Sequence, residues 1–356
     1  MATVTVVFLL LLCLTYLESR NILKNGMLIA FCFVGLFFSF RYDYGNDYSN
    51  YLRIFDDISE YDSIKECLDS REIGWTLLNY IFKWGGYQFI LFLHSAILLI
   101  IYYGLIRKYI PKKYWWLGVF ILFFNPIFFL LDLSMLRQSL AITLFVKAID
   151  YSLDKKIIYA SIVSLIGVSF HFSAIVGIPF IFLVRYIPLL KPKYVVGGMV
   201  LLLIALSMIP DIVDKVAFLI SENESISEKY GNYHTEGKLG SGMGVMLQYM
   251  FLLPIVSRKE KTGNVNVVLI CLYLVSFMFI PLSEKMVLYG RLSAYFNIFS
   301  IILVPRLLYI CKSVYIKYFT LLCVLFYIIY SYVTFFYSET YGYAYITYQS
   351  VLSLPQ

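Results

Sequence analysis

Residues 41–72 read RYDYGNDYSNYLRIFDDISEYDSIKECLDSRE and form the first long polar interruption in an otherwise hydrophobic chain. The stretch is acidic, with nine carboxylates against four basic residues. On both sides of it the sequence returns to apolar runs, each close to the roughly 20 residues that a helix needs to cross a bilayer. We therefore expect a membrane protein whose spans hold this loop at one membrane face.

The composition excludes a soluble globular protein. Of the 356 residues, 61% are hydrophobic and 14% are charged, and the mean hydropathy is +0.78. The apolar runs do not alternate with polar residues as membrane strands do, so helices are expected. The predicted fold is all-α, one polytopic transmembrane domain over 1–356 with about twelve spans: 3–17, 26–40, 87–106, 114–131, 136–153, 157–171, 172–187, 194–210, 243–257, 265–283, 290–310 and 317–337.

The distribution of charge predicts the orientation, because basic residues are retained in cytoplasmic loops. With the N-terminus outside, the inner face receives 18 basic and 4 acidic residues, a charge of +14. The outer face then carries 11 basic and 18 acidic residues, a charge of −7, and the two faces account for the formal +7. The basic balance is thus a topology signal, and we expect no nucleic-acid partner.

Two long loops fall on the outer face, 41–86 and 211–242. Within the first, IGWTLLNYIFKW (73–84) is apolar but too short to span, which indicates a re-entrant or interfacial helix. The second is rich in Ser, Asn and Gly. It is either a flexible segment that orders on substrate or a mobile connector, and its His234 and Lys238 are only guesses for a site.

Cysteine usage gives no sign of a disulfide framework or a metal centre. Five of the six cysteines lie inside apolar runs, and only Cys67 lies in a long polar loop. No Cys or His spacing resembles a zinc site. The outer carboxylates could hold a metal, but arginines supply the same electrostatic stabilisation, so we expect no metal and no cofactor. The first run, 3–17, lacks a basic n-region and a cleavage site and is interpreted as a span.

The first candidate motif follows the second span and combines Arg41, Asp47, Tyr48 and Tyr51, with Glu72 further on. Two carboxylates and an arginine at a membrane surface suit a ligand that contains sugar and phosphate, with the tyrosines as stacking platforms. The alternative is a solvated acidic loop with aromatic interface anchors.

Two further motifs place polar residues at the ends of apolar helices. Arg137 and Gln138 lie in SMLRQSLA, where the guanidinium would bind phosphate oxygens, or else snorkel to the interface or pair with Asp132. His171 lies in FHFSA between two short spans. It is a candidate general base, or else a hydrogen-bonded core histidine.

The last motif, GRLSAYF, places Arg291 at the outer mouth of a span, with Tyr295 one turn on. Arg41, Arg137 and Arg291 are thus three arginines at outer helix ends in a chain with few embedded charges. This pattern indicates a shared anionic ligand.

Taken together, RYDYGNDYSNY, EIGW with LLNY, SMLRQSLAI, FHFSAI and GRLSAYF resemble the EpsG family of polysaccharide-assembly membrane proteins, over about residues 35–310. The resemblance implies a GT-C-type glycosyltransferase of the bacterial inner membrane. It would be a Wzy-type polymerase that joins undecaprenyl-diphosphate-linked repeats at the outer face, in contact with membrane lipid and with the flippase and chain-length regulator of its pathway. The matching positions are Arg41, Asp47, Tyr48, Glu72, Arg137, Gln138, His171 and Arg291.

Under this resemblance the arginines would neutralise the departing diphosphate, with Arg137 and Arg291 in the leading roles and Arg41 in support. His171 would activate the acceptor hydroxyl, and Asp47 or Glu72 would serve only if burial raised the pKa of the carboxyl. An O-antigen ligase or another polyprenyl-phosphate-dependent transferase would share these features. A lipid-linked-sugar flippase is less well supported, because no internal repeat is evident. A purely structural subunit would not require such residues.

Overall fold

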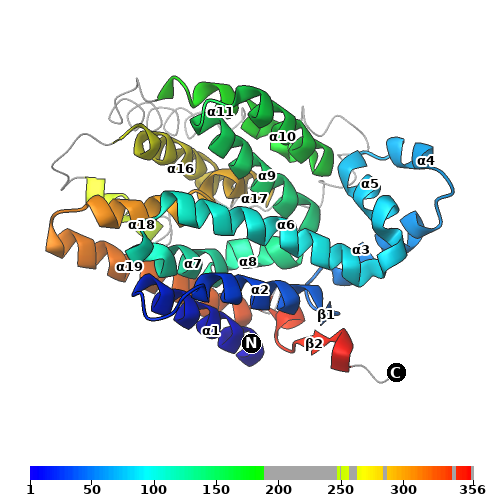
Figure 1. The fold of residues 1–356 in the computed structure, drawn as a ribbon, viewed down its shortest axis with the longest axis horizontal. Helices are drawn as coiled ribbons and strands as arrows, with labels where there is room; N and C mark the ends of the chain where they lie inside the picture. The colour runs from blue at the N-terminus through cyan, green and yellow to red at the C-terminus, as the bar shows by residue number, and fades with distance from the viewer. Residues whose placement is uncertain (188–246, 249, 256–262, 284–286, 339–341, 354–356) are drawn as a thin grey trace.

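The computed structural model describes residues 1–187, 247–248, 250–255, 263–283, 287–338 and 342–353. Helices dominate this part of the chain, and its only sheet is a single pair of two-residue strands. Most helices run broadly along the longest axis of the molecule, and α3 (Tyr48–Ser59), α4 (Ile64–Leu68) and α5 (Ile73–Phe82) gather at one end (Figure 1). We call this the loop end. The all-α prediction is confirmed.

The apolar runs of the sequence become helices with nearly the predicted bounds, because polar residues punctuate the runs. They are α1 (Ala2–Ser19), α2 (Gly26–Ser39), α6 (Gly86–Tyr109), α9 (Leu136–Leu153), α10 (Ile157–Phe170), α16 (Asn264–Ser283) and α19 (Val314–Phe336). The expected span 172–187 instead forms a 3-10 segment, η3 (Phe172–Gly177), followed by the short helix α11 (Ile178–Leu183). Among the described residues, three helical stretches are long and apolar enough to span a membrane, and five if bent pairs count as single spans. The total of twelve stays a prediction, and expected span 194–210 lies outside the described residues.

Two of the predicted spans are broken helices. In the first, α7 (Trp115–Phe124) and α8 (Pro126–Leu133) meet at 60°, because Pro126 cannot continue the ladder of α7 and instead starts a new helix. The Asn125 side chain caps that new helix by accepting a hydrogen bond from the Ile127 amide at 3.2 Å. In the second, α17 (Val287–Asn297) and α18 (Ser300–Ile310) meet at 43°.

The two chain ends lie at the same end of the bundle. The N-terminal amine donates to the Tyr345 carbonyl at 3.2 Å, and β1 (Arg41–Tyr42) pairs antiparallel with β2 (Gln349–Ser350). Met1 precedes α1 and Tyr345 follows α19, so the chain starts and finishes at the same end (Figure 1).

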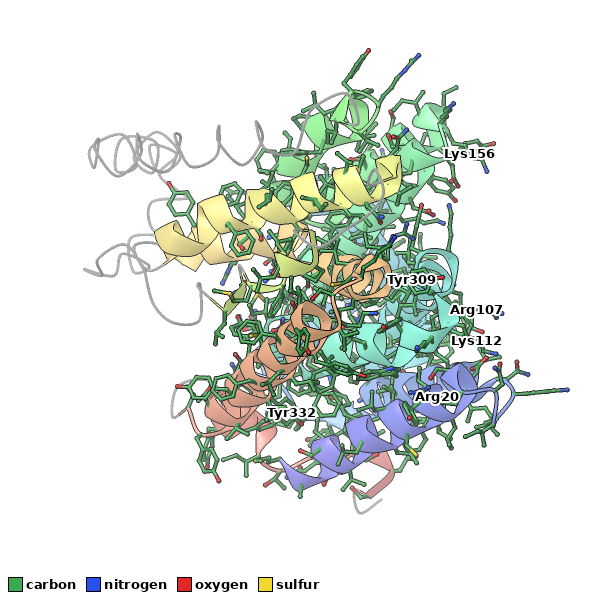
Figure 2. The ribbon with its side chains drawn as sticks, turned by 90° about the vertical axis from the view of Figure 1, so that its left-hand side faces the viewer. Arg20, Arg107, Lys112, Lys156, Tyr309 and Tyr332 are labelled. Carbon is green, nitrogen blue, oxygen red and sulfur yellow. The ribbon has the colours of Figure 1, made fainter. Side chains whose placement is uncertain are left out.

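The opposite end is basic. Arg20 follows α1, Arg107 and Lys112 flank the connection from α6 to α7, and Lys156 follows α9; all four line one side of the molecule (Figure 2). Beside them, Lys108 of α6 binds Asp150 of α9 at 2.6 Å and Asp154 at 2.7 Å. We call this the basic end. These five basic residues, all predicted for the cytoplasmic face, thus lie away from the loop 41–86.

Candidate functional site

The loop 41–86 folds onto the bundle as three short helices. Helix α3 is amphipathic, and Tyr48, Tyr51, Phe55 and Ile58 form its buried face. Helix α5 covers most of the predicted helix 73–84 and leads through a 3-10 turn, η1 (Lys83–Gly85), into α6. Whether α5 is re-entrant or interfacial stays a prediction. The start of α5 places the EIGW motif at the loop end.

Gly74 determines how closely α5 approaches α10. A Cβ atom at this position would lie 2.3 Å from the Ser169 Oγ and 2.9 Å from the Ser169 carbonyl carbon. Only glycine therefore permits this contact without a shift of one helix. The consequence is that Glu72, immediately before α5, lies beside His171, immediately after α10.

Glu72 joins two other predicted residues into what we call the Glu72 cluster: Glu72, Arg137 and His171. Its Oε1 lies 2.5 Å from the His171 Nδ1, and its Oε2 accepts a hydrogen bond from the Arg137 Nη1. The three side chains are 16%, 26% and 23% exposed, so they are only partly shielded from a ligand. Arg137 occupies the first turn of α9, where the helix dipole disfavours a cation, and the Glu72 carboxylate offsets that effect. Its partner is Glu72, not the alternative Asp132.

Two aromatic rings, those of Tyr51 and Trp75, support the Arg137 side chain of the cluster. The Arg137 guanidinium lies 5.4 Å from the centre of the Tyr51 ring, and the Tyr51 hydroxyl accepts from the Arg137 amide at 3.5 Å. Trp75 packs edge-on against Tyr51 with ring centres 5.4 Å apart. Both rings are buried, so they orient Arg137 and offer no open face to a sugar in this structure.

Asp47 lies on a turn that is fastened to the junction of α8 and α9. Gly45 has a φ of +115°, and a Cβ there would meet the Leu133 carbonyl oxygen at 2.8 Å. The Asn46 amide donates to the Ser134 Oγ at 2.9 Å. Burial raises the pKa of Asp47, and the charges of Arg291 and Arg137 oppose that rise. Asp47 therefore lies within electrostatic range of both arginines.

Helix α17 brings the last motif to the same place. The Gln138 side chain donates to the Arg291 carbonyl at 2.9 Å, which ties the start of α9 to α17. The Tyr295 hydroxyl lies 2.9 Å from the Ser173 Oγ, in the 3-10 turn η3 (Phe172–Gly177) that follows His171. Tyr295 is fully buried, so it holds this turn in place and does not face a ligand directly.

Arg41 and Tyr48 lie beside the cluster rather than in it. The Arg41 side chain is buried and donates to the Phe38 carbonyl at 2.8 Å and the Leu133 carbonyl at 3.3 Å. Tyr48 is also buried, and its hydroxyl accepts from Gln88 at 3.1 Å. In this conformation both side chains fasten the loop 41–47 to the bundle, and neither presents its polar group to a ligand.

The C-terminal segment also touches the site, which the sequence did not predict. The Tyr345 hydroxyl hydrogen-bonds the Ser134 Oγ, and the Gly45 amide donates to the Ala344 carbonyl at 3.4 Å. The available signal was the tyrosine-rich run YGYAYITY (341–348) after the last span. This segment helps to fix the turn that carries Asp47.

The described residues include no group of three or more His, Cys, Asp or Glu side chains that could hold a metal ion. The loop 211–242, with His234 and Lys238, lies outside the described part of the chain. The Glu72 cluster itself offers hydrogen bonding, ion pairing and proton transfer.

These observations define a helical membrane protein with a charged cluster of Arg, His and carboxylate side chains at its loop end. The chain belongs to the EpsG family, whose sequence model matches residues 24–350. Members of this family are Wzy-like polymerases. The match extends beyond the resembling motifs to α2 and to the C-terminal segment that touches Ser134. No curated protein sequence and no solved structure matches the chain.

Proposed function

We propose that the protein is a membrane glycosyltransferase that polymerises lipid-linked oligosaccharide repeats. The growing glycan leaves its undecaprenyl diphosphate carrier and is joined to a sugar hydroxyl of an incoming lipid-linked repeat. The observation that supports this most strongly is the Glu72 cluster, which brings a histidine, an arginine and a carboxylate from three distant motifs together in a chain of the EpsG family.

In the proposed reaction, the bond between the anomeric carbon and the diphosphate oxygen breaks, and the diphosphate keeps the electron pair. A new glycosidic bond forms to the acceptor oxygen, and the proton of that hydroxyl passes to a base. Arg137 and Arg291 neutralise the departing diphosphate, because a guanidinium matches phosphate oxygens in charge and geometry. His171 accepts the proton through Nε2, since Nδ1 faces Glu72.

Asp47 fits a second role in this scheme. It lies within electrostatic range of Arg137 and Arg291, on a turn that is fastened to Ser134. A carboxylate within electrostatic range of two diphosphate-binding arginines can accept hydrogen bonds from sugar hydroxyls. We assign Asp47 to orientation of the sugar, with proton abstraction as the alternative that a variant at this position tests.

The membrane orientation is part of the proposal. Arg20, Arg107, Lys112 and Lys156 gather at the basic end, which suits the cytoplasmic side of a bacterial inner membrane. The Glu72 cluster then faces outward, where lipid-linked repeats arrive after a flippase has moved them. About twelve spans in a GT-C-like arrangement complete the proposal. A chain-length regulator would contact the same face.

The test is complementation of a polymerase-null strain with wild type, Arg137→Ala, Arg291→Ala and His171→Ala at matched membrane levels. Wild type should restore a ladder of surface glycan, and the variants should leave glycan of one repeat. Asp57→Asn, in the same loop but on the exposed face of α3, is the matched control and should restore the ladder. Restoration of glycan attachment in a ligase-null strain, with no ladder in the polymerase-null strain, would instead identify a ligase. A wild type that restores neither strain would contradict both activities.

A further inference from the structure

The two oxygens of the Glu72 carboxylate contact two different residues, Arg137 and His171, which have different roles in the proposed reaction. One oxygen contacts the His171 Nδ1 at 2.5 Å, and the other accepts from the Arg137 guanidinium. Since the proposed function assigns Arg137 to the diphosphate, Glu72 holds a position on Arg137 that a phosphate oxygen needs. Carboxylate and phosphate oxygens use the same guanidinium donors with the same geometry.

We infer that Glu72 is a positioning residue that exchanges partners. It occupies Arg137 until a diphosphate arrives, yields Arg137 to the diphosphate, and keeps His171 in the orientation that accepts a proton. This inference rests on the proposed function, because it assumes that a diphosphate is the anion that reaches Arg137.

The surroundings of Arg137 favour such an exchange. Its side chain is 26% exposed, so an anion can approach from the open side without unfolding α9. Tyr51 holds the guanidinium from the other side through its ring, and this contact does not depend on Glu72. A diphosphate carries more negative charge than one carboxylate, so Coulomb attraction to Arg137 favours the ligand over Glu72.

The contact between Glu72 and His171 survives the exchange because it uses the other carboxylate oxygen. A carboxylate at Nδ1 accepts a hydrogen bond from the N–H of that nitrogen, and this tautomer leaves Nε2 with the lone pair that a general base requires. Gly74 keeps α5 against α10 throughout, so Glu72 cannot move far from His171. When the diphosphate binds Arg137, His171 would thus keep the orientation in which Nε2 can accept a proton.

A purely structural ion pair would behave differently. If Glu72 only fastened α5 to α9, its removal would loosen the loop end, and anions would bind no better than before. If Glu72 competes with the ligand, its neutral isostere should bind diphosphate more tightly while it transfers sugar more slowly. Tighter diphosphate binding by the isostere is therefore predicted by the competing role and not by the structural one.

The experiment uses the full-length protein in nanodiscs, with inorganic pyrophosphate and farnesyl diphosphate as probes. Their dissociation constants are measured for wild type, Glu72→Gln, Glu72→Asp, Arg137→Ala and the control Asp57→Asn. Glu72→Gln should bind both probes about two- to fivefold more tightly, the effect of removing one partly exposed competing ion pair. Arg137→Ala should lose most of the binding, and Asp57→Asn should match wild type. Tighter binding of farnesyl diphosphate alone would show that the lipid chain must accompany the diphosphate.

The second readout is polymerisation of lipid-linked repeats by the same samples. Glu72→Gln should lower kcat about 100-fold or more with a KM that is unchanged or lower, because the base loses its orienting carboxylate. Glu72→Asp should recover part of kcat. Equal or weaker binding of both probes by Glu72→Gln would overturn the inference, as would a wild-type kcat. If wild type binds the probes but forms no polymer, the proposed function fails, and the probe affinities still decide whether Glu72 competes for Arg137.

Discussion

The His171 Nδ1 lies 2.5 Å from the Glu72 Oε1, although ninety-nine residues separate the two in the chain. The contact exists because Gly74 lets the first turn of α5 lie against the last turn of α10. Arg137 joins them from the first turn of α9. Three helix ends thus supply one side chain each, so the site depends on helix packing as much as on the side chains themselves.

Replacement of His171 should abolish polymerisation without unfolding the protein. His171→Ala removes the proposed base, and loss of a general base costs about 100- to 10,000-fold in rate. The neighbouring Phe172→Ala is the control, because that ring is 66% exposed on the outer surface of the bundle. Rate assays with lipid-linked repeats, paired with thermal unfolding of both variants, test this. A His171→Ala protein that retains more than a tenth of the wild-type rate would exclude His171 as the base.

Gly74→Ala should damage the site through backbone packing. The new Cβ would overlap the Ser169 Oγ and carbonyl carbon, so α5 must move away from α10. We expect a loss of about 1–3 kcal/mol in the free energy of unfolding and a marked fall in activity.

Gly104→Ala provides the matched control, since a Cβ at that position in α6 meets nothing within 4 Å. It should be neutral or should stabilise the protein by up to about 1 kcal/mol, because alanine favours a helix more than glycine does. Denaturation curves for the two variants compare them directly. Equal stabilities would show that the approach of α5 to α10 does not require glycine.

The arginines should separate into two classes. Arg41→Ala leaves the Phe38 and Leu133 carbonyls without their donor inside the bundle, at a cost of about 1–3 kcal/mol for each unsatisfied group. Arg137→Ala should instead fold normally and lose diphosphate binding. Thermal unfolding and pyrophosphate binding of the purified variants distinguish the two. A stable Arg41→Ala protein that fails to bind pyrophosphate would restore Arg41 to the ligand site.

Asp47 should affect stability in a pH-dependent way. Burial raises its pKa in the folded protein, so the folded state binds a proton more tightly than the unfolded state. Stability therefore falls as the pH rises from the unfolded pKa through the raised folded pKa, and ionised Asp47 opposes folding near neutral pH. Asp47→Asn should raise the Tm near neutral pH, and the gain should shrink at about pH 4. A gain that grows in acid would contradict the sign of this shift.

The C-terminal segment should contribute through Tyr345. Tyr345→Phe removes the hydroxyl that contacts Ser134 and should destabilise the protein by about 0.5–1.5 kcal/mol, with a partial loss of activity as the Asp47 turn loosens. Tyr343→Phe is the control, because that side chain is 81% exposed. Unfolding and polymerisation assays should show no change for the control. Identical behaviour of the two variants would remove Tyr345 from the site.

Much of the helical architecture follows from the sequence, since apolar runs end where polar residues begin. The run 136–153 becomes α9 with those bounds, and 26–40 becomes α2 with one residue fewer. The 60° break between α7 and α8 was not predicted, although Asn125 and Pro126 signal it. The spans were predicted from the hydrophobicity of whole apolar runs, and a local bend does not change that quantity.

The residue types of the site were predictable, but their partners were not. Glu72, Arg137 and His171 were each expected as functional residues, because charged and titratable groups at membrane helix ends are costly without a role. Their contact depends on how α5 packs on α10, which no local pattern encodes. Arg41 follows the same sequence logic but lies buried against two carbonyls. Burial of that kind depends on the tertiary position of α8 and could not be read from the motif.

The most direct test is polymerisation by the purified full-length protein in vesicles supplied with one lipid-linked repeat unit. Mass spectrometry should detect glycans of two or more repeats on a single carrier, together with one released polyprenyl diphosphate for each bond formed. Arg137→Ala and His171→Ala should give neither product, whereas Asp57→Asn should give both. Release of the diphosphate without longer glycan, or polymer from the Arg137→Ala protein, would contradict a polymerase with its site at the Glu72 cluster.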